Sequence, residues 1–492
     1  MSASLTNMKI AFRADASVQI GAGHVMRCLT LADALRTSGA QTHFLCRRLP
    51  GHLGELIHAR GHALDWLPDS GVDADNSAAA LAQGAPWDWL VVDHYALAAA
   101  WETAQRGRAN KILAIDDQAD RPHDCDLLLD QNLQTGNRYD GLLPATCRQL
   151  IGPRHALLRP AFAAARRARP PRDGRVARLL LFFGGADAEG ETLKALAALD
   201  LLGRHELDVD VVIGATNPHR AAIAAACAAR PRTALHLQAE NMAELMAAAD
   251  LCLGAGGGAC WERCCVGLPA LVVATAANQI EQCRVLAEAG ALIYLGAAVD
   301  CDAARWANAL AWLLALPQLL AHLSRQGWSL VDGEGARRVA GHLLATQLTP
   351  RRATTADSAA LLAWRNHPDT RRRSFDPAEI APATHERWFE AVLADPDREL
   401  LIVERAGAPL GVLRYDIADG RALVSIYLVP GLAGQGWGTR LLLAGEAWLR
   451  RQRPDVRVLE AAIASANIAS SRAFQAAGFA TDHALYRKVL HD

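Results

Sequence analysis

Short hydrophobic runs alternate with longer amphipathic stretches from the start of the chain to about residue 340. Unbroken hydrophobic runs of strand length occur in KIAFRAD, THFLCR, WDWLVVDHY, KILAIDD and DLLLDQN. Between them, HVMRCLTLADALRTSG and GHLGELIHARG have the spacing of amphipathic helices, and each ends at a glycine. Hydrophobic strands separated by helices predict a parallel sheet that is covered by helices on both faces.

The pattern restarts after a basic, proline-containing segment at residues 165–177, ARRARPPRDGRVA, which we interpret as a linker. RLLLFFGGADAEGETLKALAAL predicts a strand, a glycine turn and a helix. LDVDVVIGA predicts a further strand. MAELMAAADLCLGAGGGACWERCCVGLPALVV predicts a helix, a strand, a second glycine turn, a helix and a strand. Two successive blocks of this kind predict two Rossmann-like domains, whose ligands bind beyond the carboxyl ends of the strands.

The last third of the chain has a different pattern. ELLIVERAGAPLGVLRYDIADGRALVSIYLVP predicts consecutive antiparallel strands, followed by a glycine loop, a helix and the strand VRVLEAAI. The sequence therefore predicts an α/β fold with two Rossmann-like domains, residues 1–160 and 161–348, followed by an α+β domain at residues 349–492.

Composition excludes some classes of protein. The 51 basic and 52 acidic residues give a formal net charge of −1, which argues against a general nucleic-acid binder or an electrostatic membrane binder. The start of the chain, MSASLTNMKIAFRADAS, lacks the hydrophobic core of an export signal, and no uninterrupted hydrophobic run approaches the roughly 20 residues that span a bilayer. We expect a monomeric, cytoplasmic protein that binds neither nucleic acid nor membranes.

The cysteine pattern favours free thiols. All 11 cysteines lie between Cys28 and Cys301, and an odd number in a chain without an export signal argues against a disulfide framework. The densest group, Cys260, Cys264 and Cys265, lacks paired C-x-x-C spacing and an adjacent histidine. Buried thiols are therefore favoured over zinc ligands, and we expect no metal.

The first glycine turn, IGAGHVMRC, places a histidine where a helix begins. Gly21 and Gly23 allow tight bending, and the helix from about His24 presents amide hydrogens and its positive dipole end. A G-x-G turn of this kind also occurs as a purely structural turn, and a histidine there also serves as a cap.

The front block resembles the PseG family of UDP-sugar hydrolases, which are relatives of the two-domain GT-B glycosyltransferases. The motifs that carry the resemblance occur in order over residues 8–340: RADASVQIGAGHVMRCLTLA, VVDHY, IDDQADRPHDCDLLLDQN, GPRHALLRPAF, FFGGADAEG and GAGGGACWERCCVGLPALVVATAANQ. The resemblance implies metal-independent hydrolysis of UDP-2,4-diacetamido-2,4,6-trideoxy-β-L-altropyranose with inversion, and His24 matches the family's catalytic histidine.

This chemistry suits an imidazole. UDP leaves as a stabilised anion, so the general acid that ordinary inverting glycosidases need is dispensable. One base near neutrality then suffices to take a proton from the attacking water. The helix dipole disfavours the positive form of His24, which would keep this base neutral.

Glycine loops and polar strand ends supply the other candidate residues of this block. Two glycine loops would accept the diphosphate, the resemblance implies that Glu262 binds the ribose, and Asn278 and Gln279 would end the next strand. Asp116 and Asp117 form a like-charge pair that would raise the pKa of one of them if they are buried together, although helix capping is an equal alternative. The residues expected to bind the UDP-sugar are Arg13, Asp15, Gly21, Gly23, Asp93, Tyr95, Gly184, Gly185, Gly256, Gly257, Glu262, Asn278 and Gln279.

The last block resembles the GNAT N-acetyltransferases, through VSIYLVPGLAGQGWGTRLLLAGEAWL and ANIASSRAFQAAGF. The resemblance implies acetyl-CoA as cosubstrate, and the amide of Leu428 or Val429 would polarise the thioester carbonyl. Two positions depart from the family pattern: Ala433 replaces the first Arg or Gln of the loop, and Phe474 replaces a tyrosine acid. The acid is open between Tyr486 and Ser471. The expected cosubstrate-binding residues are Leu428, Val429, Gly434, Gln435, Gly436, Gly438, Thr439 and Asn467.

Residues 361–389 indicate which class of acceptor the last domain acetylates. LLAWRNHPDTRRRSFDPAEI…THERWF resembles the PseH-type acetyltransferases, which acetylate the 4-amino group of a UDP-4-amino-4,6-dideoxy sugar. By this resemblance the acceptor site would be lined by Trp364, Arg365, Asn366, His385 and Trp388.

The product of that acetylation is the substrate of the hydrolase, so the chain reads as a fusion of two consecutive steps of pseudaminic acid biosynthesis. The first would N-acetylate UDP-4-amino-4,6-dideoxy-N-acetyl-β-L-altrosamine. Three alternatives stay open: a GT-B glycosyltransferase fused to an acetyltransferase for another amino sugar, a sensor whose last domain has lost activity, and a different 4-amino sugar.

Overall fold

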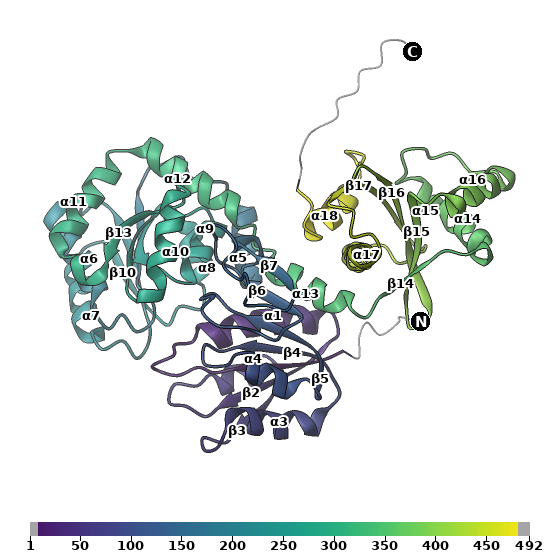
Figure 1. Ribbon diagram of the computed structural model, residues 1–492. Helices are drawn as coiled ribbons and strands as arrows, with labels where there is room; N and C mark the ends of the chain where they lie inside the picture. Colours follow the sequence, from purple (N-terminus) through teal and green to yellow (C-terminus); the bar gives the residue numbers. More distant parts are fainter. Residues whose placement is uncertain (1–7, 481–492) are drawn as a thin grey trace, which may run out of the picture. The chain divides into compact units, whose positions relative to one another are not determined.

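The computed structural model describes residues 8–480, and the chain divides into two compact units, Met1–Ala336 and Arg337–Asp492 (Figure 1). The first unit contains two parallel sheets and the second contains one mixed sheet.

The first sheet has seven parallel strands in the order β3-β2-β1-β4-β5-β6-β7. Its core consists of hydrophobic residues from the central strands and the covering helices, such as Leu90, Ile112 and Trp101. The elements are β1 (Lys9–Ala14), α1 (Gly23–Thr37), β2 (Gln41–Arg47), α2 (Gly54–Ala59), β3 (Ala63–Leu67), α3 (Asp73–Gly84), β4 (Trp87–Asp93), α4 (Ala99–Gln105), β5 (Ala109–Ile115), β6 (Leu127–Asp130) and β7 (Arg148–Ile151).

The second sheet has six parallel strands in the order β10-β9-β8-β11-β12-β13. Alternate residues of one strand enter separate cores, because Leu179 and Leu181 face α6 and α11 whereas Leu180 faces α8 and α9 (Figure 1). The elements are α5 (Pro160–Ala168), β8 (Arg178–Phe182), α6 (Glu191–Leu202), β9 (Asp208–Ile213), α7 (Arg220–Ala229), β10 (Thr233–Leu237), α8 (Met242–Ala248), β11 (Leu251–Ala255), α9 (Ala259–Cys265), β12 (Ala270–Ala274), α10 (Ala277–Glu288), β13 (Ile293–Ala297), α11 (Ala303–Leu314) and α12 (Pro317–Leu330).

Both sheets therefore have the Rossmann order, with a switch point between β1 and β4 in the first and between β8 and β11 in the second. This confirms the predicted fold class for the first unit.

The predicted linker at residues 165–177 is wrong in part. Its first residues complete α5, and Arg172 is buried. The Arg172 guanidinium donates to the carbonyl oxygens of Ala249 (2.7 Å), Val266 (2.6 Å) and Met246 (2.7 Å). This segment is therefore a packed part of the second half rather than a free connection.

The second unit is built on a five-stranded sheet in the order β14-β15-β16-β17-β18. The first four strands are antiparallel, and the short β18 is parallel to β17 over only three residues, Arg421–Leu423. The elements are α13 (Gly335–Ala345), β14 (Thr349–Arg352), α14 (Ser358–Asn366), α15 (Pro368–Arg371), α16 (Pro382–Ala394), β15 (Arg398–Arg405), β16 (Ala408–Ala418), β17 (Arg421–Leu428), α17 (Trp437–Gln452), β18 (Val458–Glu460) and α18 (Ile468–Ala476).

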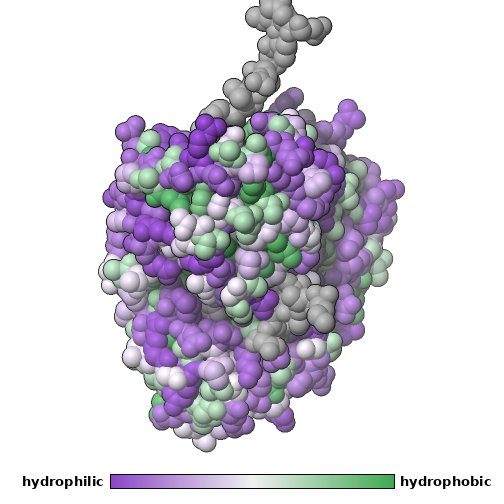
Figure 2. All heavy atoms as spheres, turned by 90° about the vertical axis from the view of Figure 1, so that its right-hand side faces the viewer, coloured by the Kyte–Doolittle hydropathy of each residue, from purple (hydrophilic) through white to green (hydrophobic). Residues whose placement is uncertain are grey.

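On the face drawn in Figure 2, small groups of hydrophobic residues are scattered among hydrophilic ones. Within residues 8–480, no single helix is long and hydrophobic enough to cross a membrane. One pair of segments, Ala303–Leu314 and Pro317–Ala345, meets the length and composition criteria only jointly, and it is bent by 94°.

Candidate active sites and similarity to known proteins

His24 lies at the switch point of the first sheet. It is the second residue of α1, and its neighbour Asp93 is the last residue of β4. The Nδ1 atom of His24 lies 2.6 Å from Oδ1 of Asp93, and both side chains are buried. A carboxylate only accepts hydrogen bonds, so this contact places a proton on Nδ1, and in the neutral ring Nε2 is then the acceptor.

Arg27, one helical turn after His24, completes this contact. Its Nη2 and Nε atoms donate to Oδ1 and Oδ2 of Asp93, each at 2.6 Å, and its Nη1 atom donates to Asp117 at 3.0 Å. Burial by itself would raise the pKa of Asp93, but the charges and hydrogen bonds of Arg27 and His24 hold it well below its usual range. Arg27 is not among the residues predicted from the sequence, although its i+3 spacing from His24 could have revealed it.

Tyr95 closes the other side of the imidazole. Its ring meets the His24 ring edge-on, with 4.6 Å between the ring centroids. Burial and a hydrogen bond to Asp117 raise the pKa of Tyr95. His24, Asp93 and Tyr95 are thus brought together as predicted, and Asp117 belongs to the same group.

Asp116 and Asp117 have separate partners, so the raised pKa considered for this pair does not arise at Asp116. The Asp116 carboxylate lies 2.9 Å from Arg121 and 3.8 Å from His123, whereas Asp117 accepts from Arg27. Burial favours a higher pKa, but these cationic partners and a backbone hydrogen bond from Ala119 lower the pKa of Asp116 to about 2.

Arg13 and Asp15 form a closed ion pair beneath the switch point. The Arg13 guanidinium is fully buried and contacts Asp15 (2.7 Å), Asp73 (2.7 Å) and the carbonyl of Leu45 (3.4 Å). Asp15 also accepts from the amide of Arg47 at 2.8 Å. Because these contacts occupy the donors of Arg13 within the protein, they favour a structural role, which the sequence leaves as an equal alternative to sugar binding.

In the first glycine turn, Gly21 has a φ of +81° and its amide donates to the carbonyl of Ser17 at 2.8 Å. Gly23 begins α1. A side chain at either position would meet open space, so the turn requires glycine only at Gly21, for its backbone conformation.

In the second half, the predicted glycine loops follow the two strands at the switch point. Gly184 and Gly185 come after β8, and Gly256 and Gly257 come after β11. Gly184 and Gly257 have φ values of +93° and +83°, in the left-handed region that favours glycine.

The residues predicted to contact the nucleotide surround the second loop. A Cβ on Gly256 would lie 2.9 Å from the Cβ of Gln279, so this glutamine packs directly on the loop. The Oε1 atom of Gln279 accepts from the Thr275 amide at 3.0 Å. Asn278 and Gln279 lie in the first turn of α10 rather than at a strand end, which corrects their predicted position.

Glu262, in α9, is the acidic residue beside this loop. Its carboxylate lies 3.9 Å from the guanidinium of Arg159. Burial raises the pKa of Glu262 to about 7, although Arg159 and Arg263 act in the opposite direction.

In the last domain, the glycine loop leads into α17. Gly434 and Gly436 adopt φ values of +80° and +77°, and Gly438 and Thr439 lie in the first helical turn. The Gln435 side chain donates to the Gly431 carbonyl at 3.3 Å, and the Thr439 hydroxyl donates to the Ala473 carbonyl at 3.2 Å. The loop thus offers backbone amides, while these two side chains brace it.

The two candidate oxyanion donors differ. The Val429 amide donates to the carbonyl of Leu410 at 2.9 Å, so it is not freed by splaying, and this part of the prediction is wrong. Leu428 is opposite Gly411 in the same ladder, and the alternation of an antiparallel pair turns its amide away from β16. On that side β18 pairs only with Arg421–Leu423, which leaves the Leu428 amide facing the splayed edge.

Several predicted side chains of this domain have structural partners. Asn467 caps α18 through Ser470 and donates to the Arg373 carbonyl at 3.3 Å. Asn366 exchanges two hydrogen bonds, each of 2.9 Å, with the backbone of Ile380. Arg365 donates to the Asp376 carbonyl at 2.9 Å.

Trp364 and Trp388 pack against the hydrophobic core, and buried His385 contacts the Ser358 carbonyl at 3.0 Å. Ser471 lies in α18, and Tyr486 lies outside the described residues.

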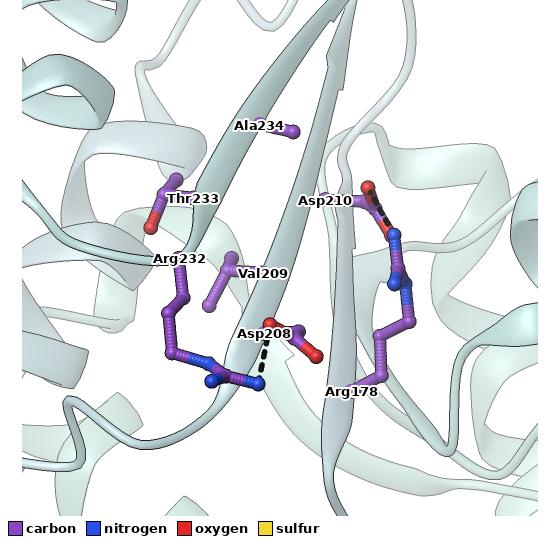
Figure 3. Close-up of a pocket in the computed structure, with 7 residues that line it drawn as sticks. All are labelled: Arg178, Asp208, Val209, Asp210, Arg232, Thr233 and Ala234. Atoms are coloured by element: carbon purple, nitrogen blue, oxygen red, sulfur yellow. Dashed lines mark hydrogen bonds and ion pairs between the residues drawn. The ribbon is translucent and has the colours of Figure 1, made fainter.

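Two other observations limit the choice of site. Arg178, Asp208 and Thr233, which begin β8, β9 and β10, line a depression of about 340 Å³ (Figure 3). It lies at the amino ends of the strands, away from the glycine loops, and its arginines are paired with Asp208 and Asp210. Within residues 8–480 no group of three or more His, Cys, Asp or Glu side chains is arranged to hold a metal ion, and all 11 cysteines are free.

Comparison with known proteins assigns each part of the chain. Residues 347–480 match the acetyltransferase (GNAT) domain family. The chain is 30% identical over 190 residues to the spore coat polysaccharide biosynthesis protein SpsG of Bacillus subtilis, covering 38% of this chain and 56% of SpsG. It is 28% identical over 241 residues to the UDP-2,4-diacetamido-2,4,6-trideoxy-β-L-altropyranose hydrolase of Campylobacter jejuni, covering 49% of this chain and 81% of that enzyme.

Among solved structures, MurG of Acinetobacter baumannii matches 68% of this chain and 98% of its own, with a TM-score of 0.51 and 15% identity, a likeness of fold. The match to SpsG spans little more than half of that relative. The chain therefore joins a unit with a MurG-like fold, similar in sequence to SpsG and to a UDP-sugar hydrolase, to a domain that matches the GNAT acetyltransferase family.

Proposed function

We propose that this chain carries out two consecutive reactions on one UDP-linked amino sugar: N-acetylation by acetyl-CoA in the last domain, then hydrolysis to UDP and the free diacetamido sugar in the first unit. The observation that carries the hydrolytic part is the 2.6 Å contact between His24 Nδ1 and buried Asp93 at the switch point of the first sheet. The similarity to the Campylobacter hydrolase supports the finer assignment to the altropyranose substrate.

In the hydrolytic step, Asp93 holds the Nδ1 proton, and Nε2 of His24 takes a proton from water. The water oxygen bonds to the anomeric carbon as the bond from that carbon to the UDP oxygen breaks, which inverts the configuration. UDP leaves as an anion, so no general acid is required. Glu262 and the loop Gly256–Gly257 are proposed to hold the nucleotide.

In the acetyl transfer, the 4-amino nitrogen attacks the thioester carbonyl of acetyl-CoA. The Leu428 amide stabilises the oxyanion that forms, and the bond between carbon and sulfur then breaks. The nitrogen loses a proton and the CoA thiolate gains one. The acceptor proposed from the similarity is UDP-4-amino-4,6-dideoxy-N-acetyl-β-L-altrosamine, because its acetylated product is the substrate of the Campylobacter hydrolase.

The experiment supplies the purified chain with this amino sugar, with and without acetyl-CoA, and follows CoA thiol, UDP and free sugar together. We expect CoA release followed by equal amounts of UDP and free sugar, with UDP release lost in His24→Ala. His58→Ala, which changes an exposed histidine in α2, is the matched control. CoA release without UDP until a sugar acceptor is added would instead identify a glycosyltransferase.

A further inference from the structure

Arg27 pairs with the carboxylate that contacts His24, that of Asp93, and with a second carboxylate, that of Asp117. It lies one turn after His24 on the same helix face, and its side chain is 12% exposed. Three of its nitrogens donate to two carboxylates: Nε and Nη2 donate to Asp93, the last residue of β4, and Nη1 donates to Asp117, which lies two residues after the end of β5. A carboxylate held on both oxygens by one guanidinium has a fixed orientation, which a single point charge does not provide.

The charge of Arg27 matters to the proposed base. An isolated buried carboxylate beside an imidazole favours the protonated ring, and a protonated ring has no lone pair with which to accept a proton from water. The bidentate ion pair with Arg27 offsets the charge of Asp93 while leaving its Oδ1 atom in contact with His24 Nδ1.

Other ionisable groups near His24 do not supply this compensation. Tyr95 is uncharged at neutral pH, Asp117 adds a second negative charge, and the Cys28 thiol only donates to Asp93 at 3.7 Å. On the side of β1, Arg13 is committed to Asp15 and Asp73, and His94 lies 3.4 Å from Asp15. Arg27 is therefore the cation that neutralises Asp93.

We propose that Arg27 is a positioning residue for the hydrolysis. By donating to both oxygens of Asp93 and to Asp117, it orients Asp93 toward Nδ1 of His24. It also keeps Nε2 of His24 unprotonated, so that this atom can receive the proton of the attacking water. The proposal rests on the proposed function, in which His24 is the base. Arg27 contributes in two ways, through its positive charge and through the forked geometry of its guanidinium.

Two substitutions test these contributions separately. Arg27→Met removes both charge and fork, and Arg27→Lys keeps the charge but loses the fork. Arg36→Met, which changes an exposed arginine in the last turn of α1, is the matched control. Single-turnover UDP release from the acetylated UDP-sugar is measured from pH 5.5 to 9.5, together with thermal melting and UDP binding of each variant.

For Arg27→Met we expect the acid limb of the rate profile to move upward by about 1 pH unit or more, with a loss of about tenfold at pH 7 that is partly recovered at pH 9. Arg27→Lys should leave the limb in place and lower the plateau by about tenfold, since the geometry alone is impaired. Arg36→Met should match the unmodified chain.

A uniform loss at every pH in Arg27→Met, with an unchanged limb, would overturn the proposal, because a structural defect alone lowers the rate without moving the profile. Full activity in either Arg27 variant would overturn it as well. If Arg27→Met does not fold, the Lys variant decides: a plateau equal to that of the unmodified chain overturns the role of the fork. Retained UDP release in His24→Ala would instead refute the proposed function, so the two failures are distinguishable.

Discussion

Replacement of His123 by glutamine should remove the contribution of this side chain to the pH dependence of the free energy of unfolding. His123 is buried between two carboxylates, with Nδ1 at 2.7 Å from Glu102 and Nε2 at 3.8 Å from Asp116. Burial opposes the charged ring, but these two partners raise the pKa of His123 from 6.5 to about 9. The folded protein thus holds this proton more tightly than the unfolded chain does.

The sign and size of the effect follow from linkage. Because the folded pKa is above the unfolded value, the ion pairs of His123 stabilise the fold fully below pH 6.5, and this stabilisation is lost as the pH rises through about 9. At about 1.4 kcal/mol per pKa unit the difference corresponds to roughly 3 kcal/mol. The 3.8 Å contact with Asp116 is too long for a hydrogen bond, so the expected value is about 2 kcal/mol.

The assay is urea unfolding of the first unit within the full chain at pH 6 and at pH 9.5, followed by tryptophan fluorescence. The free energy of unfolding should fall by about 2 kcal/mol more in the unmodified chain than in His123→Gln. His58→Gln, at an exposed position of the same half, should behave like the unmodified chain. Parallel pH dependences for the unmodified chain and His123→Gln would refute the reasoning.

Three further predictions concern the loops and the proposed sites. Gly214→Ala should lower the stability of the second half by about 2–4 kcal/mol, because its Cβ would lie 2.6 Å from the backbone oxygen of Gly185; thermal melting tests this, with Gly107→Ala, which meets open space, as control. UDP affinity, measured by calorimetry, should rise about tenfold from pH 6 to pH 8 as Glu262, with a pKa of about 7, ionises, whereas Glu262→Gln should lack this rise. Leu428→Pro, which removes the proposed oxyanion donor, should slow CoA release by about 100-fold or more and leave UDP release from the acetylated sugar unchanged, while Leu428→Ala should retain both; equal CoA release in the two variants would contradict the assignment.

The sequence predicted the central strands well and the edge strands poorly. Five strands were not predicted: β3, β7, β10, β13 and β14, and each lies at the edge of its sheet. Edge strands are covered on fewer sides, so their sequences need not be uniformly hydrophobic; in β10 and β13 no residue is fully buried. Runs of hydrophobic residues indicate buried strands, so partly buried strands are harder to predict from the sequence.

The sequence predicted those site residues that lie at the start of a helix or at the end of a strand. His24 at a helix start and Asp93 at a strand end could be placed from the sequence, because the ends of parallel strands meet at one edge of a sheet. Two outcomes depended on contacts between residues far apart in sequence. Arg13 is taken up by Asp73, 60 residues away, and the amide of Val429 by Leu410. Such contacts cannot be predicted from the spacing of residues along the chain.

The buried arginine between the two halves of the first unit bears on how the molecule can be divided. Arg172 comes before β8, yet its guanidinium donates to carbonyls in the last turn of α8, directly after α8 and directly after α9. A fragment that starts at the first strand of the second sheet would leave these oxygens without a donor. If this chain is cut into its halves, or if a half is exchanged with that of a relative, the junction should therefore lie before α5. The segment that carries Arg172 then stays with the second half, whose carbonyls it binds.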